Sequence, residues 1–92
     1  MKRIPIEAID TQTDRQYRAD SMRDAFARWG VSATRLQKAI YDGTPVEVHD
    51  RGTNENLSLV FRLGETSNWK VDVCVIREGS RENVRRYRIT RR

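Results

Sequence analysis

The 92-residue sequence contains one cysteine, Cys74, and one histidine, His49. A single cysteine excludes an intramolecular disulfide, and one cysteine and one distant histidine do not supply the clustered ligands of a zinc module. Cys74 lies among valines in an alternating stretch, which predicts a small buried side chain rather than a reactive thiol. We therefore expect no metal site, no cofactor and a reducing, cytoplasmic location.

Long apolar runs are also missing. No stretch approaches the roughly 18 residues that a membrane span requires, and the N-terminal MKRIPIEAID lacks the apolar segment of a secretory signal. We expect a soluble protein with no membrane contact. No repeat, low-complexity tract or Pro/Gly-rich linker divides the chain, so its length predicts a single domain, residues 1–92. A core of this size supports only modest stability.

The usual catalytic motifs do not occur. The sequence has no Gly-rich phosphate loop, no Ser-centred elbow and no carboxylates paired at helical spacing, so we expect no catalytic residues and no enzymatic activity. A small ribonuclease of the toxin kind needs only Arg, Tyr and Lys side chains, which are available here. An RNA-directed effector, either a binder or a nuclease, therefore remains the third possibility.

The basic charge is concentrated at one end of the chain. The net charge is +5; residues 1–80 carry 12 basic and 12 acidic side chains, whereas residues 81–92 carry six Arg and one Glu. A basic terminal segment indicates an anionic partner, most often nucleic acid. An edge strand kept soluble by its arginines is the alternative. The residues expected to contact phosphates are Arg85, Arg86, Arg88, Arg91 and Arg92.

Apolar residues at helical spacing mark the segment from 14 to 43. Two helices are predicted, one within 14–29 that ends at Gly30 and one over 33–41 that is capped by Ser32 and ends at Asp42-Gly43. The residues of the first apolar stripe are Met22, Ala25, Phe26 and Trp29. Those of the second are Leu36, Ala39 and Ile40.

Alternation with a period of two marks the rest of the chain. Strands are predicted around 46–49, 57–63, 69–76 and 84–90, and Pro5 confines any strand over 2–8 to a sheet edge. Phe61 and Trp69 are expected in the core. The fold class is therefore α+β: an N-terminal helix-turn-helix-like helix pair followed by a three- to four-stranded antiparallel β-meander. Val60 and Ile76 fall on the outward side, which suggests that helices or another subunit cover part of it.

The helix pair over residues 22–41 has the pattern of a helix-turn-helix. Only Gly30, Val31 and Ser32 join the two helices, and Gly permits the positive φ of a sharp turn. The second helix keeps one face polar, with side chains of the types that contact base edges in a major groove. These candidates are Ala33, Thr34, Arg35, Gln37, Lys38 and Tyr41.

The segment GVSATRLQKAIYDGTPVEV resembles the turn, recognition helix and following strand of the Cro repressors of lambdoid phages, within residues 22–49. This resemblance implies DNA-facing positions at Ser32, Ala33, Thr34, Gln37 and Lys38, with Lys38 as the leading base reader. It also implies dimerisation through a β-strand.

The leading hypothesis is a small phage- or plasmid-type transcriptional regulator, a repressor-like homodimer that binds double-stranded DNA. Helix 32–41 reads the major groove and the Arg-rich C-terminus neutralises phosphates. Tyr87, between Arg86 and Arg88, is the one aromatic residue expected to contact nucleic acid. The alternative is a small phage-type inhibitor of a host enzyme or defence complex, whose strand edges or Arg-rich terminus bind an acidic surface of that host protein.

Overall fold

The fold has six strands and two helices in the part of the chain that the structure, a computed structural model, describes: residues 4–64, 68–77 and 83–91. Side chains are described for residues 4–64, 68–75 and 85–91. The elements in chain order are β1 (Ile6–Asp10), β2 (Gln16–Ala19), α1 (Met22–Trp29), α2 (Ala33–Asp42), β3 (Val46–Asp50), β4 (Glu55–Leu63), β5 (Trp69–Arg77) and β6 (Asn83–Arg91).

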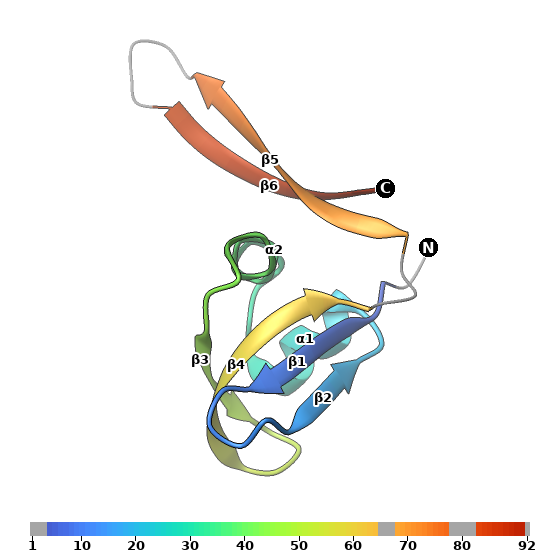
Figure 1. Ribbon diagram of the computed structural model, residues 1–92, viewed down its shortest axis with the longest axis vertical. Coiled ribbons are helices and arrows are strands. Elements are labelled where there is room, and N and C mark those ends of the chain that lie inside the picture. The colour runs from blue at the N-terminus through green and yellow to red at the C-terminus, as the bar shows by residue number, and fades with distance from the viewer. Residues whose placement is uncertain (1–3, 65–67, 78–82, 92) are drawn as a thin grey trace.

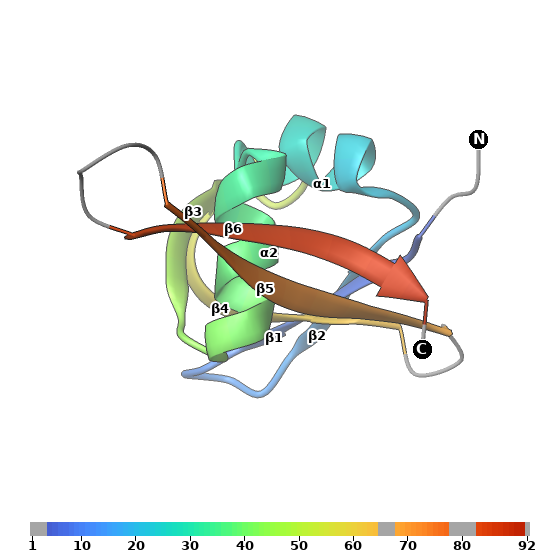
Figure 2. The same ribbon diagram turned by 90° about the horizontal axis from the view of Figure 1, so that it is seen from above.

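The strands form two separate antiparallel sheets. The first has four strands in the order β2-β1-β4-β3, and the second is the β5–β6 hairpin. Both helices pack on one face of the four-stranded sheet. The β5–β6 hairpin lies across α2 on the side away from that sheet, so that α2 is the middle of three layers (Figure 1 and Figure 2).

The predicted meander is wrong. The order of elements is β-β-α-α-β-β-β-β, and the helix pair is inserted between strands instead of preceding them. β4 pairs with β3 on one side and with β1 on the other, from Ile6 opposite Leu63 to Asp10 opposite Leu59. With both edges of β4 occupied, β5 pairs only with β6 among the described strands.

The segment before α1 also differs from the prediction. Residues 16–19 form strand β2, and the helix begins only at Met22. The reason is a turn held by Asp10, whose carboxylate accepts hydrogen bonds from the Gln12 backbone N–H (2.9 Å) and the Thr13 hydroxyl (3.0 Å). Asp14 completes this turn with a φ of 58°.

Strand β1 is central rather than an edge strand. It pairs with β2 and with β4, which contradicts the edge position expected from Pro5. The strand begins at Ile6, just after the proline, so no ladder hydrogen bond is lost. The Pro5 carbonyl instead accepts a hydrogen bond from the Gly64 N–H (3.0 Å).

The Ser32 cap and the C-terminal ends of both helices are confirmed. Ser21 and Ser32 cap the helices, each accepting a hydrogen bond from the backbone N–H three residues later. Gly30 and Gly43 end them in the left-handed conformation, both with a φ of 69°.

The core lies between the helices and the four-stranded sheet. Trp29 packs edge to face on Phe61, with ring centroids 5.4 Å apart, which confirms Phe61 as a core residue. Phe26, placed by its spacing on the buried stripe of α1, is instead 55% exposed. Trp69 is half-buried in the hairpin, outside the core cluster. The core comprises Ile6, Ala8, Ala19, Ala25, Trp29, Val31, Leu36, Ala39, Val48, Leu57, Leu59 and Phe61.

An ion pair between the half-buried Arg28 and the fully buried Asp50 joins α1 to the end of β3. The Arg28 guanidinium donates to both carboxylate oxygens of Asp50, from Nε to Oδ1 (3.0 Å) and from Nη2 to Oδ2 (3.1 Å). The Asp50 side chain has no exposed surface, and its Oδ1 also accepts from the Gly52 N–H (2.8 Å). The Arg28 guanidinium also lies over the ring of Tyr17 in β2 and over that of Trp29 in its own helix. Through Asp50 and Tyr17, Arg28 therefore holds α1 against both β3 and β2.

This pair makes the stability of the protein pH-dependent. Burial raises the pKa of Asp50, but the hydrogen bonds from Arg28 and Gly52 outweigh it and hold the pKa below the ordinary value of 3.8. A pKa lowered by folding contributes stability above the unfolded-state value, and that stability is lost as the pH falls through the folded value. We expect urea-unfolding free energies to agree at pH 7 and pH 5 and to fall below about pH 4. An Asp50→Asn variant should lose part of this acid dependence.

Candidate nucleic-acid interface

Helix α2 has one apolar side on the sheet and one polar side with most of the predicted DNA contacts. Leu36 and Ala39 are buried and Ile40 is half-buried, as predicted. Gln37 is the exception among the polar candidates: it is half-buried, and its Nε2 lies 3.9 Å from Met22 Sδ on α1. The exposed candidates are Ser32, Ala33, Thr34, Arg35, Lys38 and Tyr41.

The β5–β6 hairpin has two chemically different faces. Residues alternate along each strand and directly opposed residues share a face, so the register assigns every side chain to one of them. The inner face, toward α2, consists of Trp69, Val71, Val73, Val75, Arg85, Tyr87, Ile89 and Arg91. The outer face, toward solvent, consists of Lys70, Asp72, Cys74, Arg86, Arg88 and Thr90.

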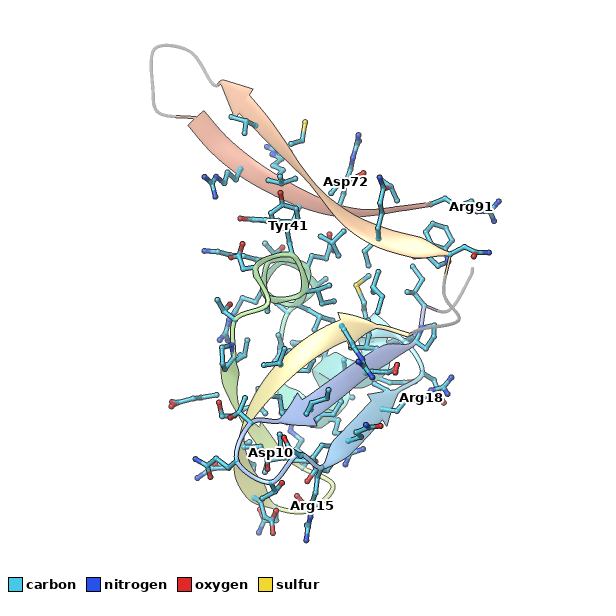
Figure 3. The ribbon with its side chains drawn as sticks, viewed as in Figure 1. Asp10, Arg15, Arg18, Tyr41, Asp72 and Arg91 are labelled. Carbon is cyan, nitrogen blue, oxygen red and sulfur yellow. The ribbon has the colours of Figure 1, made fainter. Side chains whose placement is uncertain are left out.

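A pair of tyrosines joins the inner face to α2. Tyr41 points from the helix toward the hairpin, and its ring centroid lies 5.6 Å from that of Tyr87 (Figure 3). Ile40 of α2, Leu63 at the end of β4 and Val71 of β5 line a common groove. Val75, further toward the end of β5, is 56% exposed, so α2 covers only part of the inner face.

Removing one of these rings should loosen the hairpin without unfolding the sheet. An aromatic pair of this kind contributes about 0.5–1.5 kcal/mol beyond the area that it buries. We expect Tyr87→Ala to accelerate amide hydrogen exchange throughout β5 and β6 and to leave β1 and β4 unchanged. Phe26→Ala removes a ring that is already 55% exposed and serves as the control. Equal acceleration in both sheets would show that the hairpin does not move independently.

The net charge of the protein resides in the hairpin segment. Residues 1–67 carry ten basic and ten acidic side chains, whereas residues 68–92 carry eight basic and three acidic ones. Arg85, Arg86, Arg88 and Arg91 are all exposed on β6; Arg92 lies outside the described residues. The hairpin is therefore a basic arm on an electrically neutral body.

Three arginines of the body lie within 4 Å of carboxylates. Besides the Arg28–Asp50 pair, Arg62 Nη2 lies 3.4 Å from Glu7 Oε1 and Arg18 Nε lies 3.9 Å from Asp20 Oδ1. Arg62 and Arg18 also line a shallow hollow on the outer side of the four-stranded sheet. Each of these two arginines has a carboxylate within 4 Å, which weakens the attraction that the hollow offers to an anion.

Asp72 is the one acidic residue in strands β5 and β6. Its Oδ2 accepts a short hydrogen bond from the Thr90 hydroxyl (2.6 Å), and its Oδ1 lies 3.6 Å from Lys70 Nζ. The Thr90 hydrogen bond is the main reason that the pKa of Asp72 lies below its ordinary value, with Lys70 and Arg88 adding to the effect. The outer face therefore has a fixed negative centre between positive side chains.

Cys74 is exposed on this outer face, which corrects the prediction of a buried side chain. The alternation that turns the valines of β5 toward α2 necessarily points Cys74 the other way, together with Lys70 and Asp72. The same pattern in the sequence marks Lys70, Asp72 and Thr90 as members of the arginine face. The sequence alone does not place them there, because the register of β5 against β6 is what brings them beside Arg86 and Arg88.

Other polar clusters in the described residues have simpler structural roles. His49 lies between two amide oxygens, 2.9 Å from Asn56 Oδ1 and 3.0 Å from Asn54 Oδ1, at the β3–β4 turn. Among residues 4–64, 68–77 and 83–91, no group of three His, Cys, Asp or Glu residues could hold a metal ion. No helix in these ranges is long and apolar enough to cross a membrane.

The chain matches no protein-family model, no curated protein and no solved structure.

Proposed function

We propose that the protein is a small DNA-binding regulator and that its β5–β6 hairpin supplies the affinity for duplex DNA. The observation that carries the proposal is the excess of basic side chains on the described part of the hairpin, which lies as an outer layer on a body whose sequence carries no net charge (Figure 1). Arginine side chains that neutralise phosphates release condensed counterions, and this release drives association with any duplex.

Helix α2 supports the arm in this proposal. Its Tyr41 holds the inner face of the hairpin through Tyr87, and its exposed Arg35 and Lys38 lie on the neighbouring layer. Both basic groups can add phosphate contacts beside those of the hairpin. The homodimer expected from the sequence stays a prediction, and light scattering of the purified protein tests it.

The test is binding of the purified protein to a fluorescently labelled duplex of arbitrary sequence over a range of salt concentrations. We expect the logarithm of the association constant to fall linearly with the logarithm of salt, with a slope of roughly −3 to −4 for contacts by the four exposed arginines of β6. No binding at about 50 mM salt, or binding without salt dependence, would contradict the proposal.

A further inference from the structure

The outer face of the β5–β6 hairpin has the dimensions of an element that enters a DNA groove. Each strand has nine residues, which corresponds to a ribbon about 30 Å long. The major groove of B-form DNA is about 12 Å wide and admits a two-stranded ribbon. The hairpin forms the outermost layer of the described structure, and no other described element lies over its outer face (Figure 1).

The chemistry of this face matches base edges better than it matches the phosphate backbone. Arg86 and Arg88 are exposed there, and a guanidinium donates two parallel hydrogen bonds to O6 and N7 of guanine. Asp72, opposite Arg88, would repel a phosphate but accepts from the amino group of cytosine. Arg85 and Arg91 project from the other face of β6, where both are exposed and Arg91 lies over the Trp69 ring, so neither belongs to the base-reading face.

Single-stranded RNA fits this face poorly. Proteins that read single strands stack the bases on exposed aromatic rings, and the six described side chains of the outer face include no aromatic residue. The aromatic residues of the hairpin, Trp69 and Tyr87, lie on the inner face against Arg91 and Tyr41. The major groove of duplex RNA is too narrow and deep for side chains to read.

The position of α2 disfavours it as the reading element. A helix in the major groove needs clear space around its outward side, but the hairpin crosses α2 on the side away from the sheet (Figure 2). Tyr41 is committed to that contact, and Gln37 is half-buried against α1. Thr34, Arg35 and Lys38 remain exposed. They belong to the middle layer and are not on the outer face of the hairpin.

From these observations we infer that the outer face of the hairpin reads duplex DNA in the major groove, with Arg86 and Arg88 selecting guanine and Asp72 selecting cytosine. This inference rests on the proposed function, because it names the reading surface of the same DNA-binding protein. It replaces Lys38 by Arg86 and Arg88 as the residues that determine specificity.

The experiment is selection from a pool of randomised duplexes at about 150 mM salt, followed by sequencing of the retained DNA. Four proteins are compared: wild type, Arg86→Lys, Arg88→Lys and Lys38→Ala. A lysine keeps the positive charge but cannot form the paired hydrogen bonds to guanine, so it separates base reading from phosphate contact. We expect wild type to enrich a short G·C-containing site, and each arginine-to-lysine variant to lose about tenfold in preference at one position.

The controls make the outcomes distinguishable. Both lysine variants keep their charge and should bind random duplex within about twofold of wild type. Lys38→Ala should select the wild-type site, with a lower affinity for every duplex because it loses a phosphate contact. Retention of DNA by wild type without enrichment would overturn the inference and leave the proposed function standing. Loss of the selected site in Lys38→Ala, with both lysine variants unchanged, would also overturn the inference. No retention of duplex, or preferential retention of a single-stranded RNA competitor, would overturn the proposed function as well.

Discussion

Replacing Arg85, Arg86 and Arg88 by Gln is expected to weaken binding to duplex DNA about 100-fold at about 150 mM salt. All three side chains are exposed on β6, and the two strands of the hairpin contain one acidic residue, Asp72, to offset them. The salt dependence should fall with the affinity, by roughly one unit of slope for each lost phosphate contact. A fluorescence anisotropy titration at several salt concentrations measures both quantities.

The control removes the same charge from the body of the protein. Arg15, Arg18 and Arg23 are exposed on or near β2 and α1, and their replacement by Gln lowers the net charge by the same three units. If binding depended only on net charge, the two triple variants would weaken it equally. We expect the body variant to stay within about threefold of wild type, since its arginines lie outside the proposed contact surface.

Replacing Asp50 by Asn is expected to lower the free energy of unfolding by about 3 kcal/mol. The carboxylate has no exposed surface and receives two hydrogen bonds from Arg28 and one from the Gly52 N–H. Loss of its charge leaves the guanidinium without its partner between α1 and the β3–β4 turn. A domain of this size has a total stability of only about 5–14 kcal/mol, so the melting temperature should fall by roughly 12 °C or more.

Asp20→Asn provides the matched control for this stability prediction. Its carboxylate pairs with Arg18 at 3.9 Å, but both side chains are about two-thirds or more exposed (68% and 70%). Exposed pairs of this kind contribute less than about 1 kcal/mol. Equal melting temperatures for Asp50→Asn and wild type would show that the Arg28–Asp50 contact does not stabilise the fold.

The helices were the predictable part of the fold, because their limits are encoded by adjacent residues. Ser21 and Ser32 cap the helices, and Gly30 and Gly43 end them, in agreement with local sequence rules. The strand alternation after Pro45 was equally visible. These features depend on neighbours within about four residues, which is the range over which periodicity is informative.

Long-range strand pairing was not predictable in the same way. The paired residues of β1 and β4 lie about fifty positions apart in the chain, from Asp10 opposite Leu59 to Ile6 opposite Leu63, and neither strand has a local pattern that identifies its partner. β2 was missed because only Tyr17 and Ala19 point toward the core, too few for a clear alternation, and because the turn before it depends on the side chain of Asp10. The position of the hairpin over α2 depends on tertiary packing, which cannot be inferred from the strand propensities of individual residues.

The candidate site was predicted in part. The arginines of β6 were identified from charge alone, and their division between the two faces of the hairpin follows from the register of β5 against β6. The polar face of α2 was also identified, and all its candidate residues except Gln37 are exposed. The layer that lies over α2 was not foreseen. That layer is the reason that we assign base reading to the hairpin and a supporting role to the helix.

The most direct test of the central claim is to map the DNA contact on the protein itself. A duplex is titrated into ¹⁵N-labelled protein, and amide chemical shifts are followed by NMR. We predict that the largest changes fall on Lys70, Asp72, Cys74, Arg86 and Arg88, with smaller ones on α2. Changes concentrated on Thr34, Arg35 and Lys38, or on the outer side of the four-stranded sheet, would contradict the account.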